Sequence, residues 1–119
     1  MSKGHVVIAV QAKNVSEAAA AVIEGLGYEP VLVQNGNQAI AAVDQNAAKL
    51  VLADYLLPEK SGLGMASALR SQGNKVPVLI FTSSDHMDRD TVLRSGASDF
   101  LKKPFKSEVL EQAIRRFGL

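Results

Sequence analysis

Short apolar runs that contain no alternating polar residues recur along this chain, and each is followed by a segment with helical spacing. A strand covered on both faces needs such a continuous run, because a parallel sheet is buried between layers of helices. Strict alternation of strands and helices therefore predicts an α/β protein, a doubly wound three-layer sandwich with a five-stranded parallel sheet and five helices. The expected strands are residues 6–10, 30–33, 50–53, 76–81 and 99–101.

The segments between these runs carry signals of helix starts and stops. Small polar residues precede each apolar stripe, where their side chains accept hydrogen bonds from the first free N–H groups of a helix. The second helix is expected to turn Ile40, Val43 and Ala47 inward. The expected caps are Asn14 or Ser16 for the first helix, which Gly27 stops, Asn37 for the second and Ser107 for the last, with further helices at 63–72 and 90–94.

Length and composition limit the chain to one ordinary domain. A chain of 119 residues fits a single core, so we expect one domain over residues 1–119. Hydrophobic residues make up 47% of the chain, and no apolar run approaches the roughly 20 residues that span a bilayer. The stretch Met1 to His5 holds one basic residue and does not resemble a secretory signal. We therefore expect a cytoplasmic protein without membrane insertion.

Cysteine content and net charge exclude further classes of function. The chain has no cysteine, so a disulfide framework, a thiolate nucleophile and a thiolate metal site are all excluded. The formal net charge of +1 gives no general attraction toward nucleic acid or acidic lipid. Direct nucleic-acid binding is therefore not expected.

Three of the apolar runs end on residues whose side chains could take part in chemistry. Asp54 follows the third run, Thr82 the fourth and Lys103 the fifth, while Gln11 follows the first. In doubly wound sheets the functional crevice lies outside the carboxyl ends of the strands, where the strand order reverses. The topology therefore predicts that these four residues share one rim of the sheet.

At these residues the chain resembles the receiver domain of two-component response regulators, a CheY-like protein with a flavodoxin-like fold. The resemblance covers nearly the whole length and has the five units in the right order. Its motifs are Asp54 with Leu57-Pro58 and Ser61-Gly62-Leu63, the run 77–82, the segment 96–100 and Lys103-Pro104-Phe105.

The resemblance implies a role for each rim residue. Asp54 would be the phosphoacceptor for a phosphoryl group from a histidine kinase or a phosphotransfer protein. Thr82 would hydrogen-bond the phosphoryl oxygens, and Lys103 would pair with them. Pro104 would follow a cis peptide bond that aims the lysine, and Phe100 would stand where the family keeps an aromatic residue that packs inward on activation.

One part of the family pattern is absent. The family carries an adjacent acidic pair after its first strand, and Val10 and Gln11 occupy those positions. Mg²⁺ is a hard ion that is held by carboxylates, water and phosphate oxygens. The remaining ligands would be Asp54, the Gln11 amide and the backbone carbonyl of Leu56, so we expect weakened Mg²⁺ binding. Lys13 is an alternative source of positive charge beside a phosphoryl group.

Three functions follow from this pattern. The first is a phosphorelay receiver that uses Asp54, and the second is a pseudo-receiver that binds a protein without phosphorylation. The third is a phosphohydrolase with an aspartate nucleophile; it needs a second acid two residues later, where this chain has Leu56. We rank the phosphohydrolase last and expect no enzyme beyond self-phosphorylation.

Output is expected through a protein partner rather than through nucleic acid. By resemblance, the docking face is formed by the fourth helix, the fifth strand and the fifth helix. The chain has no room for a DNA-binding output domain, so it is either a complete small regulator or a fragment of a longer protein. The charged residues expected on this face are Arg89, Arg94, Lys106, Glu108 and Arg115.

Overall fold

The computed structural model describes residues 2–119 and contains a single five-stranded sheet that is parallel throughout. Within these residues strands and helices alternate strictly, as the apolar runs predict. The elements are β1 (His5–Ala9), α1 (Lys13–Gly25), β2 (Glu29–Val33), α2 (Gly36–Asn46), β3 (Leu50–Asp54), α3 (Gly62–Ser71), β4 (Val78–Thr82), α4 (Arg89–Arg94), β5 (Asp99–Lys102) and α5 (Ser107–Arg115).

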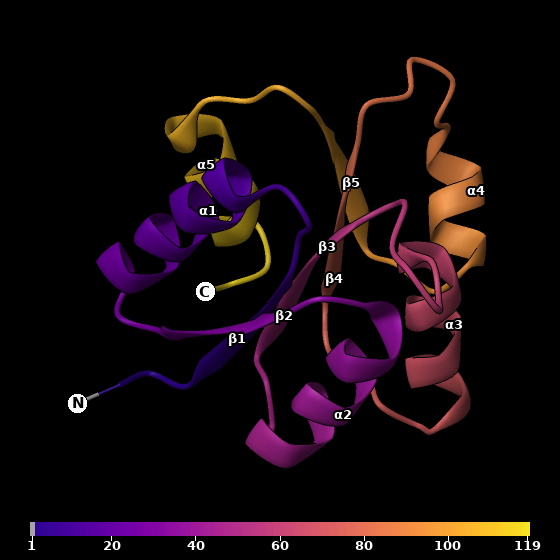
Figure 1. Cartoon of the computed structure of the whole chain (residues 1–119), viewed down its shortest axis with the longest axis horizontal. Coiled ribbons are helices and arrows are strands. Elements are labelled where there is room, and N and C mark those ends of the chain that lie inside the picture. Colours follow the sequence, from indigo (N-terminus) through magenta and orange to yellow (C-terminus); the bar gives the residue numbers. More distant parts are fainter. Residues whose placement is uncertain (1) are drawn as a thin grey trace.

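The strand order is β2-β1-β3-β4-β5, so the chain first moves outward to β2 and then runs back across the sheet. The direction reverses between β1 and β3. Loops that leave these two strands diverge to opposite faces, which opens a crevice at the carboxyl ends of the strands. The helices lie on both sides of the sheet, with α1 and α5 on one face and α2, α3 and α4 on the other (Figure 1).

The two faces of the sheet bury two separate apolar clusters. Successive side chains of a strand point to opposite faces, so each strand contributes to both clusters. In the cluster beneath α2, α3 and α4, Val7, Val51 and Val78 are fully buried side by side in the sheet register. In the cluster beneath α1 and α5, Ile8, Leu52 and Leu79 do the same. This double burial explains why the central strands carry uninterrupted apolar runs.

The start of α2 differs from the prediction. Asn35, not Asn37, caps this helix, because the side chain of Asn35 accepts a hydrogen bond from the N–H of Gln38 at 2.8 Å. The next residue is Gly36, where an added Cβ would lie 2.1 Å from the carbonyl oxygen of Lys60. The chain enters the helix directly after β2, so the cap falls earlier than the sequence indicated.

The end of α2 also differs from the prediction. Ala47, expected on the inward stripe, instead terminates the helix in the left-handed conformation with φ of 48°.

Two other predicted caps are wrong. Ala12 precedes α1 without a side-chain cap bond, while Ser16 is buried within the helix and Asn14 lies in its first turn. Lys106, again without a cap bond, precedes α5, which begins at Ser107. The burial of the apolar faces of these helices holds them in place without a polar cap.

The remaining boundaries follow the sequence closely. Ser61 caps α3 by accepting from the N–H of Gly64, and Asp88 caps α4 by accepting from the N–H of Thr91. The fourth strand begins at Val78 rather than at residue 76, and it extends to Thr82. The strand therefore includes the hydroxyl residue that the sequence placed at its end.

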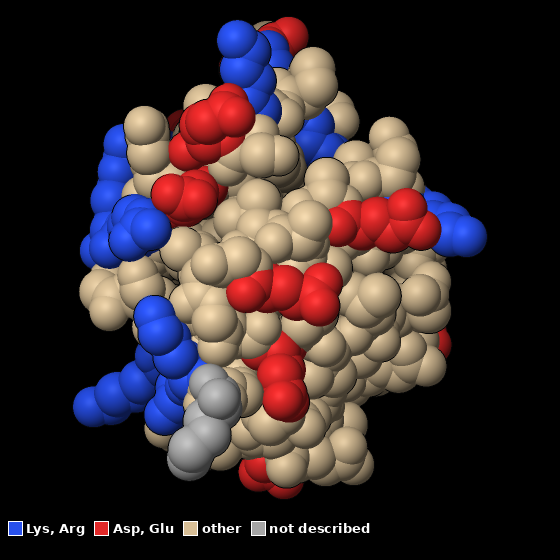
Figure 2. All heavy atoms as spheres, turned by 90° about the vertical axis from the view of Figure 1, so that its left-hand side faces the viewer, with Lys and Arg blue, Asp and Glu red and all other residues tan. Residues whose placement is uncertain are grey.

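The surface mixes charges of both signs. On the face that carries α1, acidic side chains run in a broken line and basic side chains lie around the edges (Figure 2). Across residues 2–119, no helix combines the length and the apolar character that crossing a membrane would need.

Candidate functional site

Polar residues at the ends of three strands meet on one rim of the sheet. Asp54 is the last residue of β3 and Thr82 is the last residue of β4, and both are buried, at 5% and 2% exposed. Lys103 comes directly after β5, and Gln11 lies two residues beyond the end of β1. The structure therefore brings together the four rim residues that the sequence singled out.

The backbone and an aromatic contact position Lys103. Its N–H donates to the carbonyl oxygen of Thr82 at 2.7 Å, which continues the pairing of β5 with β4 by one residue. The peptide bond between Lys103 and Pro104 is cis, as the resemblance implied. Phe105 then packs on Phe81, with ring centroids 4.8 Å apart and ring planes at 55°. These contacts fix the start of the lysine side chain beside the end of β3.

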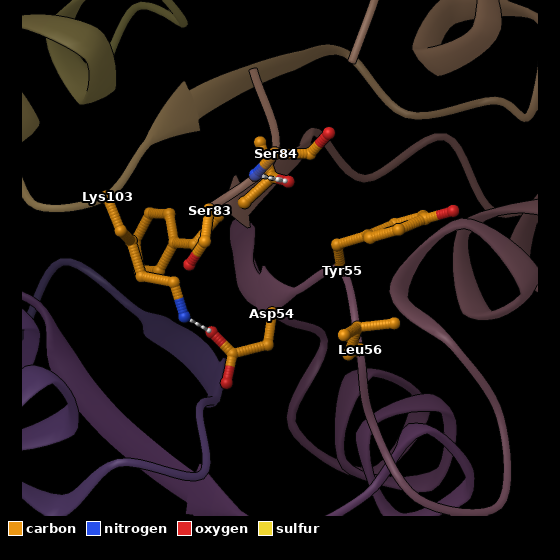
Figure 3. Close-up of a pocket in the computed structure, with 8 residues that line it drawn as sticks. Asp54, Tyr55, Leu56, Ser83, Ser84 and Lys103 are labelled. Carbon is orange, nitrogen blue, oxygen red and sulfur yellow. Dashed lines mark hydrogen bonds and ion pairs between the residues drawn. The ribbon is translucent and has the colours of Figure 1, made fainter. Parts of the chain in front are cut away.

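Both oxygens of the Asp54 carboxylate have partners. The Nζ atom of Lys103 lies 3.1 Å from Oδ1 and points at the carboxylate (Figure 3). The backbone N–H of Gln11 donates to Oδ2 at 3.0 Å. The Asp54 side chain is 7% exposed and that of Lys103 is 24% exposed, so the pair is only partly screened by water. The Asp54 carboxylate and the Lys103 ammonium form an ion pair without net charge at the carboxyl ends of the strands.

An open pocket of about 170 Å³ lies beside this pair. Ser83 and Ser84 form part of its wall, and the side chain of Tyr55 points away from the Asp54 carboxylate (Figure 3). The Thr82 hydroxyl accepts a hydrogen bond from the N–H of Ser84 at 3.1 Å. The hydroxyl thus stabilises the turn after β4, which is the structural role that an isolated threonine would have in such a place.

The loop after β3 passes unusually close to the backbone of Asp54. The N–H of Gly62 donates to the carbonyl oxygen of Tyr55 at 2.9 Å. A Cβ at position 62 would lie 2.4 Å from the carbonyl oxygen of Asp54 and 3.0 Å from Cδ1 of Ile80. Glycine at this position lets α3 start directly against the end of β3.

The donor set does not fit a bound magnesium ion. Mg²⁺ demands octahedral oxygen coordination and usually takes one or two protein carboxylates. Here Oδ1 of Asp54 faces a lysine and Oδ2 accepts a backbone N–H, so the single carboxylate of the site already has a partner on each oxygen. Residues 2–119 contain no group of three His, Cys, Asp or Glu side chains that could surround a metal ion.

Gln11 and Lys13, which were expected to assist at Asp54, direct their side chains to other partners. The Gln11 side chain donates through Nε2 to the carbonyl oxygen of Gln34, so its amide is directed to the end of β2. Lys13 lies 3.9 Å from Glu17 on the exposed side of α1. Leu56 lines the pocket and is 77% exposed, and the role of its backbone carbonyl stays a prediction.

Phe100 lies at the centre of β5, opposite Ile80 of β4. Its ring is half-buried and packs against the cluster beneath α2, α3 and α4. The aromatic side chain is therefore already part of the core. This position is compatible with the inward packing that the resemblance suggested, and its role in switching stays a prediction.

Two further residues at this rim were missed from the sequence. Gln34 follows β2 directly and supplies the carbonyl that holds the Gln11 side chain, and Ser84 supplies the N–H for the Thr82 hydroxyl. Both lie just beyond a strand's carboxyl end, so their position was the signal that could have identified them. Their contribution comes from backbone groups, which the residue type does not reveal.

Comparison with known sequences places the chain in a family. Residues 6–115 match the family described as "Response regulator receiver domain". The "Uncharacterized transcriptional regulatory protein YkoG" of Bacillus subtilis is 34% identical over 116 residues, which cover 97% of this chain and 51% of that protein. The "DNA-binding response regulator MtrA" of Mycobacterium tuberculosis is 31% identical over 102 residues, covering 86% of this chain and 45% of that protein. The chain thus spans about half the length of these relatives.

Solved structures agree with this assignment. The receiver domain of the sensor histidine kinase PA1611 from Pseudomonas aeruginosa, which has magnesium in its active-site cleft, is 28% identical with a TM-score of 0.85, covering 98% of both chains. The chemotaxis response regulator CheY4 of Vibrio cholerae has a TM-score of 0.87 at 21% identity, covering 96% of this chain and 98% of that one, and shares the fold. The chain belongs to the response regulator receiver domains of two-component signalling systems.

Proposed function

We propose that this receiver domain accepts a phosphoryl group on Asp54 and passes the signal on by protein contact. The observation that carries this proposal is the Asp54 carboxylate beside an open pocket, with the Lys103 ammonium 3.1 Å away. An ammonium in this position offsets the negative charge that gathers when a phosphoryl group reaches a carboxylate. The donor of the phosphoryl group would be a histidine kinase or a phosphotransfer protein.

Apart from the phosphohistidine of the donor, the proposed chemistry uses groups of this chain alone. A carboxylate oxygen of Asp54 attacks phosphorus while the P–N bond of the donor phosphohistidine breaks. The imidazole nitrogen keeps the electron pair, and the proton already on the other ring nitrogen lets the ring leave as neutral imidazole. Lys103 would then pair with the phosphoryl oxygens. The Thr82 hydroxyl accepts from the N–H of Ser84, which leaves its own O–H to donate to a phosphoryl oxygen. No step in this scheme passes through a metal ion.

Intact-mass spectrometry with acetyl phosphate and phosphoramidate tests the acceptor role, with and without Mg²⁺. A phosphoryl adduct on the wild-type protein that is lost in Asp54→Asn supports the proposal. An adduct that persists in Asp54→Asn contradicts Asp54 as the acceptor. Absence of any adduct with both donors, and with a purified histidine kinase, contradicts phosphorylation altogether.

A second function is favoured by the bonding of Asp54. Both carboxylate oxygens already have partners, and Gln11 and Val10 supply no further carboxylate. Such a site would suit a pseudo-receiver, which binds a protein partner in one conformation without being phosphorylated. This function predicts that partner binding is the same for the wild-type protein and for Asp54→Asn, because the state of Asp54 would not control it.

The proposed output face is formed by α4, β5 and α5. Leu93 on α4 and Val109 on α5 are large apolar side chains at 47% and 41% exposed. Exposed arginines lie on the same helices, among them Arg94 and Arg115. Protein-binding surfaces commonly combine apolar side chains with arginine.

The output face is tested by charge reversal. We expect Arg94→Glu with Arg115→Glu to abolish capture of the partner after chemical crosslinking in cell extract. The control is Lys75→Glu, which reverses one charge at an exposed residue before β4. Equal capture by all three proteins would place the docking face elsewhere.

The organisation of a longer protein is also a proposal. Relatives of about twice this length are named as transcriptional or DNA-binding regulators. We propose that residues 1–119 form one receiver domain and that this domain does not itself contact DNA. Its near-neutral charge of +1 supports the second part, since non-specific DNA binding depends on many positive charges.

A further inference from the structure

We infer that Gln11 takes the place of a divalent cation at Asp54, so that this receiver site works without metal and a carboxylate at position 11 would create a metal site. The inference rests on the proposed function only in taking Asp54 as the centre of the site. It concerns the exclusion of a divalent cation from the site and the part that Gln11 has in this exclusion.

The first support is the occupation of the carboxylate. A cation beside Asp54 would approach an oxygen lone pair on the side away from Lys103. That oxygen, Oδ2, accepts the backbone N–H of Gln11 at 3.0 Å. The partner of Oδ2 is thus a hydrogen-bond donor, which cannot become a metal ligand.

The second support is that Gln11 is fixed at both ends. While its backbone N–H holds Asp54, its side-chain Nε2 donates to the carbonyl oxygen of Gln34 after β2. The N–H of Gln34 in turn donates to Oε1 of Gln38 on α2 at 2.8 Å. This chain of hydrogen bonds turns the Gln11 amide toward β2 and anchors it there.

The third support is the balance of charge. Asp54 and Lys103 together carry no net charge, and residues 2–119 contain no group of three or more His, Cys, Asp or Glu side chains that could hold a metal ion. A divalent cation would add two positive charges beside an existing ammonium. One carboxylate does not offset three positive charges, so the cation is disfavoured even if the Gln11 N–H moves away.

The charge balance explains why one substitution would be sufficient to change the site, because Gln11→Asp keeps the backbone N–H but adds a second carboxylate. The Gln11 backbone is in hydrogen-bond contact with Asp54, so a carboxylate on this residue starts within a short side chain's reach of Oδ2. Gln11→Asp also removes the amide that donates to Gln34. Two carboxylates near each other with water between them are the usual start of a Mg²⁺ site.

The test measures metal binding directly, on unphosphorylated protein. Thermal unfolding is followed with MgCl₂ and with MnCl₂ against NaCl of equal ionic strength, and Mn²⁺ binding is followed by electron paramagnetic resonance of the free ion. A ligand that binds the folded state raises the melting temperature by mass action. The proteins are the wild type, Gln11→Asp, and Gln45→Asp, which makes the same change at an exposed residue of α2.

We expect no bound Mn²⁺ and no metal-dependent shift for the wild type or for Gln45→Asp. For Gln11→Asp we expect saturable Mn²⁺ binding and a melting temperature that rises with MgCl₂. Wild-type binding of Mn²⁺ that disappears in Asp54→Asn would overturn the inference. This result does not depend on whether the Gln11→Asp variant folds. Equal absence of binding in the wild type and in folded Gln11→Asp would overturn the assignment to Gln11.

These measurements separate the inference from the proposed phosphorylation. None of them uses a phosphoryl donor, so failure to phosphorylate Asp54 leaves the metal result intact. Conversely, a phosphoryl adduct that forms only with Mg²⁺ on the wild-type protein would contradict metal-free operation while it supports Asp54 as the acceptor.

Discussion

At the rim of the sheet, Asp54 and Lys103 stabilise each other's charged forms. Asp54 is buried, and the Lys103 ammonium lies 3.1 Å from its Oδ1. Removing one partner of such a pair leaves the other charge with poor solvation, which costs more than the pair itself contributes. Because Lys103 is 24% exposed, water replaces part of the lost contact.

Lys103→Met is therefore expected to lower the free energy of unfolding by about 2 kcal/mol, less than for a fully buried pair. The double variant Asp54→Asn with Lys103→Met is expected to recover part of this loss, since no charge is then left unpaired. Urea denaturation followed by circular dichroism measures both. The single variant Asp54→Asn is measured in the same way. If the losses of Lys103→Met and Asp54→Asn simply add in the double variant, the two residues do not interact.

The Gly62 position gives a second prediction at this scale. A Cβ at residue 62 would lie 2.4 Å from the Asp54 carbonyl oxygen, and a backbone atom cannot move aside easily. We expect Gly62→Ala to destabilise the fold by about 1–3 kcal/mol and to shift the NMR signal of the Asp54 amide.

Gly25→Ala is the matched control for this prediction. Nothing lies within 4 Å of a Cβ added at Gly25, which is the last residue of α1. Alanine there is expected to be neutral or stabilising by up to about 1 kcal/mol. A Gly62→Ala protein as stable as Gly25→Ala would show that the loop after β3 is free to move.

At the scale of elements, α4 shows how a single cap supports a short helix. This helix is six residues long, and its N-cap is Asp88. The Asp88 carboxylate accepts from the N–H of Thr91 at 2.8 Å and from the Thr91 hydroxyl at 3.0 Å. Isolated helices of this length are unstable, so the cap and the burial of Val92 together hold it.

The pH dependence of this cap follows from its hydrogen bonds. The backbone N–H of Thr91, followed by its hydroxyl, lowers the pKa of Asp88. A carboxyl whose pKa is lower in the folded state stabilises that state above its ordinary pKa, and the contribution disappears as the pH falls through the lowered pKa. We therefore expect the α4 amides to lose protection only in that acidic range.

An NMR titration of the Thr91 amide measures this effect. The wild type is expected to show a transition below the ordinary aspartate pKa, and Asp88→Ala is expected to show weak α4 protection at every pH. Asp88→Asn keeps a good capping side chain without an ionisable group, so its Thr91 amide should not follow that titration. An identical transition in Asp88→Asn would assign it to another group.

At the scale of the whole molecule, the sheet separates two apolar layers that must form together. Leu69 of α3 is fully buried on one face and Leu110 of α5 is almost fully buried on the other. Since every central strand contributes side chains to both faces, loss of packing on one face loosens the strands that the other face needs.

Leu69→Ala and Leu110→Ala are each expected to lower the free energy of unfolding by about 2–5 kcal/mol. Each variant should still unfold in one transition, with the same midpoint by circular dichroism and by tyrosine fluorescence. Separate midpoints in either variant would mean that the two layers fold as independent units.

Sequence alone was sufficient for the architecture and for the identity of the rim residues. Unbroken apolar runs such as Val6 to Val10 can be buried only between two layers, and parallel strands place their carboxyl ends at one edge. These rules brought Asp54, Thr82 and Lys103 to one rim before any coordinates were known. Helix caps were less predictable: Asn35 and Asn37 are equally good caps, and the point where β2 ends chooses between them.

The tertiary structure decided how the rim residues bond. Residue type could not show that the Gln11 backbone would hold Oδ2 of Asp54 or that the Gln11 side chain would reach Gln34. These contacts depend on groups brought together by β1, β2 and β3, which are distant in sequence. Composition and periodicity specify which surfaces are buried, whereas hydrogen bonds depend on positions and directions that exist only once the chain has folded.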